Sequence, residues 1–409
     1  MRFIVFLIKR FFFSTFKSSS LLVSIISFIG VFLGVFTLVL VLGIMQGFDE
    51  ELKKRILDVQ GHIAVFKFQA DFIENPSEVS EKIRNLKGIK VIAPFISQEV
   101  LIIKDGEVTG TLLRGIDAKE ELKILNLNEG GIQGNFSFKD GKAREIILGK
   151  TLAENLNAKL GDYVTLASPK LSVSGPLGNT GPRFLKCKVT AIVDLGLYQF
   201  NNNISYISLE NARSFFKMKG NSVSGLSIQI DNPYNASIER LTIQRMLGGF
   251  PYITSSWQEI NSNLFEAIAM ERFVMLIILI IILIVASFSI ISTLIIMVIE
   301  KMRTIGILGA MGISSRKIQL IFLATGLFIG MIGTALGIIS GLTTGSIFSR
   351  YDILNLPVDI YWIEGTPFHF PLKSMVYLVL FSMVVSFLAS SLPAWWVSKQ
   401  DPMKAIRYG

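Results

Sequence analysis

Four long stretches without Asp, Glu, Lys or Arg constrain the fold of this chain more than any other feature. They cover residues 18–48, 273–299, 318–349 and 374–398, and Ile, Leu, Val and Phe dominate all of them. A helix of about 20 apolar residues is long enough to cross a bilayer. We therefore expect four membrane-spanning helices, at residues 21–46, 271–299, 318–348 and 374–398.

The composition supports the same class of protein. Of the 409 residues, 51% are hydrophobic and 17% are charged, whereas soluble proteins carry about 25% charged residues. This balance argues against an ordinary soluble enzyme. The first apolar stretch is too long for a signal peptide and lacks a small-residue cleavage site, so we expect it to remain as an anchor.

Basic residues are concentrated in three short segments beside the apolar stretches. Residues 1–20, 300–317 and 399–409 hold eleven Lys and Arg against two acidic residues, which accounts for the whole net charge of +9. Because short loops rich in Lys and Arg stay in the cytoplasm, we expect both termini and the 300–317 segment to be cytoplasmic. A nucleic-acid partner is not needed to explain the basic pI.

Residues 47–270 are then extracytoplasmic, and residues 349–373 form a smaller loop on the same side. The chain is thus expected to be an α-helical integral membrane protein with a large α+β domain, of two subdomains, inserted between the first and second membrane helices. Apolar runs predict strands at 100–103, 111–114, 146–148, 163–167, 188–193 and 226–230. Short helices are expected at 77–86, 152–157, 209–217 and 238–247.

The sequence offers no catalytic constellation. It has no phosphate-binding G-x-x-x-x-G-K-[ST] motif, its two histidines, His62 and His369, are far apart, and Cys187 is its only cysteine. We expect no catalytic, cofactor or metal site in this chain. The apolar stretches contain none of the ionisable groups that ion-coupled transporters use, so an energy-coupled role needs energy from a partner.

The cytoplasmic segment 300–317 is the most distinctive of the three. Met302, Ile305, Leu308 and Met311 recur at intervals of three residues, and Gly312 is placed to end a helix before the next one starts. Periodicity leaves two interpretations equally open. The segment is either a helical hairpin at the lipid interface or a helix that docks into another cytoplasmic protein.

Resemblance favours the second interpretation. The run Glu300-Lys-x-Arg-Thr-Ile-Gly-Ile-Leu-x-Ala-Met-Gly312 resembles the coupling-helix motif of the MacB-like (type VII) ABC permeases, which have one span, a large external domain and three more spans. Within them the chain resembles the lipoprotein-releasing permeases LolC and LolE. Further segments that resemble this family lie in the same order along the chain, at residues 45–52, 256–267, 356–361, 393–395 and 401–408.

The resemblance implies a non-enzymatic permease subunit in the bacterial inner membrane. Its implied partners are a LolD-like cytoplasmic ATPase that holds ATP and Mg, a second permease chain (another copy or a LolE-like sibling), a lipoprotein substrate and a LolA-like periplasmic carrier. The alternatives are a MacB-like exporter of another amphiphile and an FtsX-like regulator of an extracytoplasmic hydrolase. The second alternative predicts a much smaller external domain than residues 47–272.

The resemblance also implies three groups of functional residues. The ATPase-coupling group is Glu300, Lys301, Arg303, Ile305, Leu308, Gly309, Met311 and Gly312. A Pro/Gly-rich hook at 168–184, which we call the carrier loop, would bind the carrier through Pro176, Leu177, Gly178, Pro182, Arg183 and Phe184. Ile44, Met45 and Phe48 would line a lipoprotein cavity. Ordinary packing or a plain surface loop would also account for these residues. Gly333, Gly337 and Gly341 form either a dimer seam or a packing face within the chain.

Overall fold

The computed structural model describes residues 21–68, 72–127, 131–139, 144–168, 182–351 and 366–399. The chain divides into two compact units. The first, which we call the helical unit, consists of Met1–Asp49, Ala267–Asn355 and Gly365–Gly409. The second, which we call the α/β unit, consists of Glu50–Glu266 and Leu356–Glu364.

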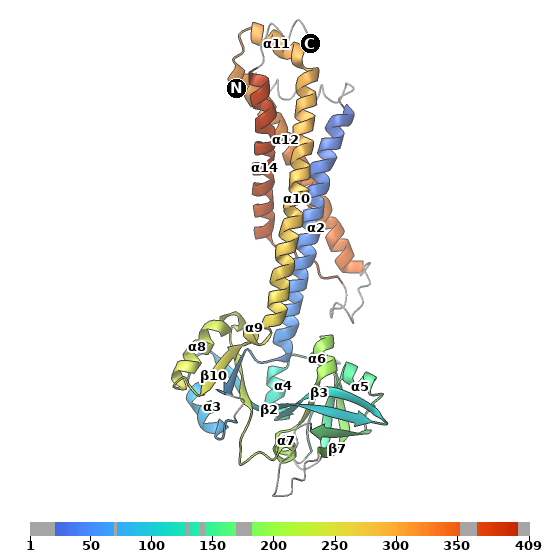
Figure 1. Ribbon diagram of the computed structural model, residues 1–409, viewed down its shortest axis with the longest axis vertical. Helices are drawn as coiled ribbons and strands as arrows, with labels where there is room; N and C mark the ends of the chain where they lie inside the picture. Colours follow the sequence, from blue (N-terminus) through green and yellow to red (C-terminus); the bar gives the residue numbers. More distant parts are fainter. Residues whose placement is uncertain are drawn as a thin grey trace. The chain divides into compact units, whose positions relative to one another are not determined.

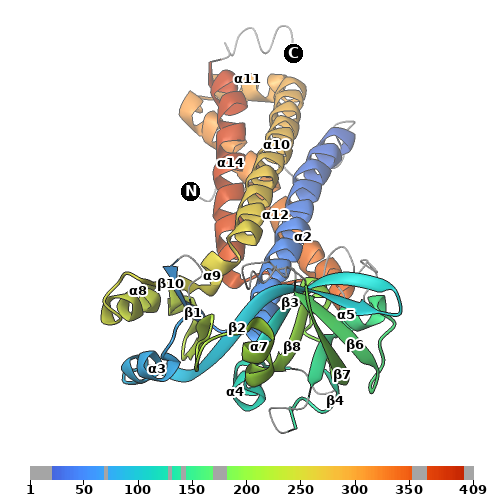
Figure 2. The ribbon, with the colours of Figure 1, turned by 60° about the horizontal axis from the view of Figure 1, so that its bottom comes forward.

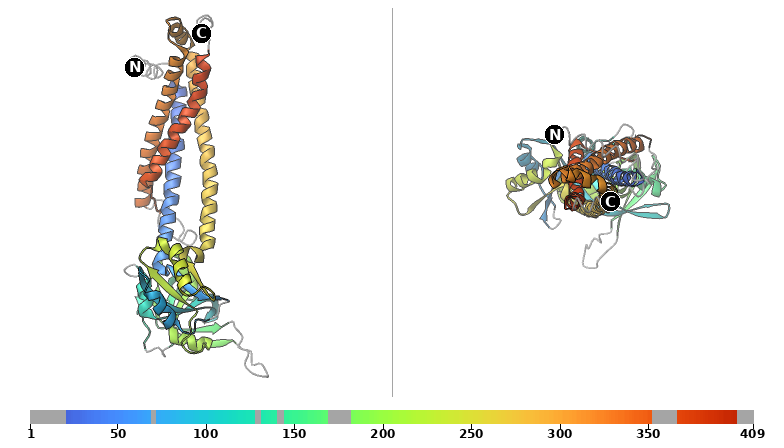
Figure 3. Two further views of the ribbon diagram at one scale, coloured as in Figure 1. Left: turned by 90° about the vertical axis from the view of Figure 1, so that its left-hand side faces the viewer. Right: turned by 90° about the horizontal axis from the view of Figure 1, so that it is seen from above.

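The prediction of four long apolar helices is confirmed (Figure 1). They are α2 (Leu21–Val59), α10 (Ser262–Glu300), α12 (Ser315–Tyr351) and α14 (Leu372–Ser398), and each is long and apolar enough to cross a membrane. A short helix, α11 (Met302–Ala310), separates α10 from α12. The left-hand view of Figure 3 shows the long helices running side by side.

Two of these helices extend well beyond the predicted spans. α2 continues from the predicted end at residue 46 to Val59, and α10 begins at Ser262, ahead of the predicted start at residue 271. The predicted ends mark where charged residues begin, and this limits the apolar stretch but not the helix. Seven of the eight residues at 50–57 of α2 are Glu, Lys, Arg or Leu, which are all good helix formers.

Small residues on α12 allow close helix packing inside the chain. A Cβ built at Gly333, Gly337 or Gly341 would lie 2.7–2.8 Å from a Val side chain of α2. Another row, Gly326 and Gly330, faces serines of α14. Among the spans, α12 has the most buried apolar window, at 56%. The three glycines left open by the sequence therefore form a packing face within the chain.

The described residues of the α/β unit form one ten-stranded sheet (Figure 2). Its strands are β1 (Ile63–Lys67), β2 (Ile89–Lys104), β3 (Glu107–Ile116), β4 (Ile132–Gly134), β5 (Glu145–Gly149), β6 (Tyr163–Ser168), β7 (Arg183–Val193), β8 (Ile204–Ser208), β9 (Gly225–Ile230) and β10 (Tyr252–Ser256). Their order is β10-β1-β9-β2-β3-β8-β5-β7-β4, and β6 pairs with β2 and β7. All six predicted strands lie within this set.

Short helices accompany the sheet. They are α3 (Pro76–Arg84), α4 (Ala118–Ile124), α5 (Lys150–Asn155), α6 (Tyr198–Asn203), α7 (Leu209–Phe216), α8 (Ala236–Met246) and α9 (Trp257–Ile260). The four predicted short helices are among them. Caps explain several starts: the Asp117 side chain accepts bonds from Lys119 N and Glu120 N at α4, and Ser208 caps α7.

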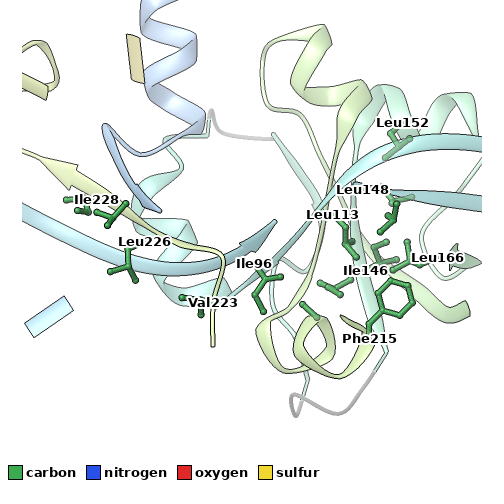
Figure 4. Close-up of a cluster of buried hydrophobic side chains, with 14 of the residues drawn as sticks. Ile96, Leu113, Ile146, Leu148, Leu152, Leu166, Phe215, Val223, Leu226 and Ile228 are labelled. Carbon is green, nitrogen blue, oxygen red and sulfur yellow. The ribbon is translucent and has the colours of Figure 1, made fainter. Parts of the chain in front are cut away.

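Strand β2 joins the part of the sheet formed by β10, β1 and β9 to the part formed by β3–β8. Its first half pairs with β9 and its second half with β3 and β6. The larger buried cluster follows the same course, from Leu226 and Ile228 on β9 to Leu148 and Leu166 on β5 and β6 (Figure 4). A second buried cluster surrounds Tyr206 and Ile147. The division into two subdomains stays a prediction, because one sheet runs through the unit.

Candidate functional site

Helix α11 turns three of the four residues spaced at intervals of three, Met302, Ile305 and Leu308, toward its own protein. Ile305 is buried, and Met302 and Leu308 are partly buried beside it. The cluster they join includes Met297 of α10, Phe322 of α12 and Val397 of α14. Much of the periodicity that predicts this helix is therefore used to attach α11 to the helical unit.

The opposite side of α11 is open. Met311 is 76% exposed, Ile307 is 47% exposed, and Arg303 is exposed as well. Because residues four apart lie on one side of a helix, these three form a continuous strip, which we call the α11 outer face. The coupling residues expected from the sequence do not include Ile307. Its interval of four from Met311 and Arg303 was the available signal.

The end of α11 has the geometry that the sequence predicts. The helix ends at Ala310, Gly312 follows with φ of +89°, and α12 begins at Ser315. A left-handed residue after a helix favours glycine. A hollow of about 260 Å³ lies at this turn, lined by Gly309, Gly312, Ser314 and Ser315 together with residues of α14. Of the remaining coupling candidates, Glu300 is exposed and Lys301 is half-buried.

The predicted cavity residues lie on α2, in the helical unit. Ile44, Met45 and Phe48 are all half-buried. Beside them, Gly43 O accepts a hydrogen bond from His369 N at 3.0 Å, and Gln46 Nε2 donates to Ser374 Oγ at 3.0 Å. Asp49 forms an ion pair with Arg272 of α10. Whether Ile44, Met45 and Phe48 contact a lipoprotein stays a prediction.

The carrier loop connects two paired strands. Ser168 ends β6 and pairs with Arg183, the first residue of β7. Pro176, Leu177 and Gly178 lie outside the described residues. The other candidates lie at or beside the start of β7: Pro182 precedes it, Arg183 Nη1 donates to Phe215 O at 3.0 Å, and Phe184 is 61% exposed. Arg183 thus has a structural contact, whereas Phe184 is available to a partner.

An exposed sheet face surrounds Phe184. Its cross-strand neighbour Ala167 pairs in turn with Leu101, which is 41% exposed. On the same strands, Lys186 Nζ lies 5.0 Å from the ring centre of the exposed Tyr163. No local sequence signal marks Leu101, Tyr163 and Lys186 as neighbours, because they meet only through the pairing of β2, β6 and β7.

Burial shifts the pKa of two side chains in the α/β unit, His62 and Cys187. Burial lowers the pKa of His62 to about 4, and His62 Nδ1 accepts a hydrogen bond from Ile230 N at 3.1 Å. Burial raises the pKa of the Cys187 thiol to about 12. Both side chains sit in the core, so they serve structure and offer no reactive group at the surface.

Comparison with known proteins adds independent findings. The family model of the MacB-like periplasmic core domain matches residues 24–240, and that of the FtsX-like permease C-terminal region matches residues 276–402. Lipoprotein-releasing system transmembrane protein LolC of Neisseria meningitidis is 30% identical, covering 94% of each chain. LolE of Haemophilus influenzae is 26% identical, again covering 94% of each chain. Among solved structures, the periplasmic region of MacB from Actinobacillus actinomycetemcomitans matches at 12% identity and a TM-score of 0.33, over 51% of this chain and 94% of that chain.

Proposed function

The chain belongs to the LolC/LolE family of lipoprotein-releasing transmembrane proteins, within the MacB-like ABC permeases, and we propose that it is the permease subunit of a complex that releases lipoproteins from the bacterial inner membrane. Both termini and α11 are cytoplasmic in this proposal, as the distribution of basic residues supports. The α/β unit is periplasmic.

The α11 outer face is the observation that carries the proposal. Two apolar side chains, Ile307 and Met311, project from a short turn between two long apolar helices, with Arg303 beside them. This strip fits an apolar groove with an acidic rim on a cytoplasmic ATPase. The buried side of α11 belongs to one cluster with α10, α12 and α14. A displacement of α11 by the ATPase would therefore be transmitted to three membrane helices.

The partner ATPase supplies the energy, and ATP and Mg bind there. The work to be done is the extraction of acyl chains, whose exposure to water costs about 0.8 kcal/mol per CH₂ group. In the proposed cycle, closure of the ATPases moves the helices, and the periplasmic unit passes the lipoprotein to a soluble carrier. The exposed side chain of Phe184 at the base of the carrier loop supports carrier docking there.

A second permease chain completes the complex. Helix α10 supports this part of the proposal, because only 12% of its apolar window is buried, against 56% for α12. The similarity to both LolC and LolE leaves the second chain as either another copy or a sibling.

Co-purification tests the function directly. The tagged chain is extracted in mild detergent, and the proteins that accompany it are identified by mass spectrometry. An ATPase together with acylated lipoproteins is the expected result. An ATPase with a different amphiphile would favour a MacB-like exporter, and an ATPase with a cell-wall hydrolase would favour an FtsX-like regulator. The absence of any ATPase would overturn the proposal.

Substitution of Met311 tests the ATPase surface. Met311→Glu places a charge on an exposed position, so we expect the chain to insert normally but to bind the ATPase about tenfold more weakly or worse. The readout is the amount of ATPase recovered with the tagged chain. Met311→Leu is the matched control and should bind as the native chain does. Equal recovery with Met311→Glu would show that α11 docks differently.

A further inference from the structure

The last turns of α2 are part of the core of the α/β unit. Glu50–Val59 belongs to this unit, although α2 is continuous from Leu21. Ile56 is 1% exposed and belongs to the larger buried cluster, and Val59 is 3% exposed and belongs to the second. A helix end that contributes to both clusters is fixed to the body of the unit by its packing.

Arg55, on the same turn of α2, forms a hydrogen bond with the loop at residues 194–197, which follows β7. Its Nε donates to Glu51 Oε1 at 2.8 Å, and its Nη1 donates to the carbonyl oxygen of Gly196. Its side chain is 23% exposed. Gly196 has φ of +74°, a conformation that suits glycine. A guanidinium can donate in two directions at once, which a lysine ammonium on a flexible stem does less well.

Hydrogen bonds and an ion pair also fix the 194–197 loop to the end of β7. Asp194, the residue after β7, accepts bonds from Gly196 N at 3.0 Å and from Asn201 Nδ2 at 2.8 Å, and pairs with Lys150 at 3.0 Å. Leu195 lies in the same buried cluster as Val59, and Leu197 in the same cluster as Ile56. Charge-assisted bonds and shared packing together hold the loop to α2 and to the strand.

Strand β7 leads from this loop to the carrier loop. It runs from Arg183 to Val193, and eleven residues of extended chain span roughly 35 Å. Its first residues pair with β6, the strand that enters the carrier loop from the other side. One end of β7 is therefore held by α2, and the other forms the base of the carrier loop.

We propose that Arg55 is a positioning residue that couples movement of α2 to β7, and through β7 to the carrier loop. The inference rests on the proposed function, in which the ATPase displaces α11 and, with it, α12. Helix α12 packs closely against α2 through Gly333, Gly337 and Gly341, so its movement reaches α2. The inference adds a defined connection from α2 to the carrier loop. The connection consists of the Arg55–Gly196 hydrogen bond, supported by Glu51 and Asp194.

The test uses the full chain with its ATPase in proteoliposomes. A cysteine-reactive spin label is placed at Lys186→Cys on β7, and in a separate sample at Ser237→Cys on α8. Native Cys187 is buried and stays unlabelled. The native complex should release lipoprotein to the carrier and show a nucleotide-dependent change in the label at 186.

In Arg55→Ala we expect ATP hydrolysis to persist, release to fall by about tenfold, and the nucleotide-dependent change at 186 to disappear. The label at 237 lies outside the α2–β7 connection, and its signal should be the same as in the native complex. Lys54→Ala, an exposed neighbour on the same helix, is the matched control and should behave as the native chain. Glu51→Gln keeps an acceptor for Arg55 Nε and should retain most of the release.

The two proposals fail in different ways. If the native complex releases no lipoprotein, the proposed function is wrong, whatever Arg55 does. If the native complex releases lipoprotein and Arg55→Ala keeps both release and the change at 186, the coupling role of Arg55 is overturned. If Arg55→Ala lowers the melting temperature, Arg55→Met is measured instead, because methionine keeps an apolar stem but has no N–H to donate to Gly196. Full retention of the change at 186 in that variant also overturns the inference.

Discussion

His62, the residue before β1, bonds to strand β9 and to the first residue of helix α9 through its own atoms. Its backbone N–H donates to Ile228 O at 2.9 Å, its carbonyl accepts from Trp257 N at 2.9 Å, and Nδ1 accepts from Ile230 N. Burial lowers its folded pKa from 6.5 to about 4. A protonated Nδ1 cannot accept the bond from Ile230, so protonation opposes folding.

This pKa predicts how stability depends on pH. Between pH 6.5 and about 4 the unfolded chain binds the proton and the folded chain does not, so the free energy of unfolding falls as the pH falls through this window. The loss attributable to His62 is at most about 3 kcal/mol. Melting temperatures of the full chain in detergent, from pH 7 to 4, measure it.

Carboxylates also titrate in this pH window. The informative quantity is therefore the difference in melting temperature between the native chain and a variant that lacks the His62 imidazole. His62→Asn keeps a side-chain acceptor near Ile230 but does not titrate. Its melting temperature should fall less steeply with pH than that of the native chain. Parallel curves for the two proteins would mean that His62 is not the responsible group.

Single residues also show where sequence reasoning reaches its limit. The three-residue spacing on α11 correctly predicts a helix and its end near Gly312. It cannot tell whether the apolar stripe faces the protein or a partner, because both are apolar surroundings. The structure places Ile305 inside and Ile307 outside. Likewise, Leu101 and Phe184 are brought to one face by strand register, which has no local signal.

At the scale of elements, close packing at α2 makes a sharp prediction. A Cβ at Gly47 would lie 2.6 Å from the carbonyl carbon of Pro367 and 2.9 Å from Phe368 N, both backbone atoms. At Gly34, on the same helix, the nearest atoms are side chains at 3.5 and 3.7 Å. Gly47→Ala should therefore destabilise the chain by about 1–3 kcal/mol through overpacking.

Gly34→Ala is the matched control, because it makes the same chemical change where there is room. Alanine is favoured over glycine in a helix by about 1 kcal/mol, so this variant should be neutral or slightly stabilised. Melting temperatures in the same detergent compare the two. An equal response at both positions would contradict the packing of residues 366–368 against α2.

Elements are predictable where one physical signal dominates. The four long helices follow from uninterrupted apolar length, and the six expected strands from short apolar runs. Missed elements such as β8 and α4 are five and seven residues long, too short to show a period. The extension of α2 to Val59 has no such signal, because the charged residues that dominate 49–55 look like a surface segment and hide the buried Ile56 and Val59 that follow.

At the scale of the whole molecule, α10 leaves a continuous apolar strip uncovered. Ile281, Val285 and Phe288 are 55%, 61% and 64% exposed, and they lie on one side of the helix. The other side, with Ile290 and Leu294, is buried. Lipid alone would satisfy such a strip. The proposed function requires a second permease chain, and α10 is the span with most surface left for it.

Cysteine cross-linking in membranes tests whether lipid or a second permease chain contacts the apolar strip on α10. Native Cys187 is buried and should not react, so a single introduced cysteine reports alone. We expect Ile281→Cys and Phe288→Cys on α10 to form disulfide-linked dimers on mild oxidation. Val384 on α14 is 55% exposed in the native chain. Val384→Cys is therefore the matched control, and it should not cross-link. The geometry required is strict, since bridged Cα atoms lie within about 7 Å of each other.

The products also identify the second chain. A band at twice the mass of this chain means that two copies pair, because the bridge then joins identical positions across a two-fold axis. When cysteines are introduced at matching positions of a sibling permease, a mixed product means that the sibling pairs with this chain. Cross-linking at Val384 but not at α10 would place the second chain against α14, and the strip on α10 would then face lipid.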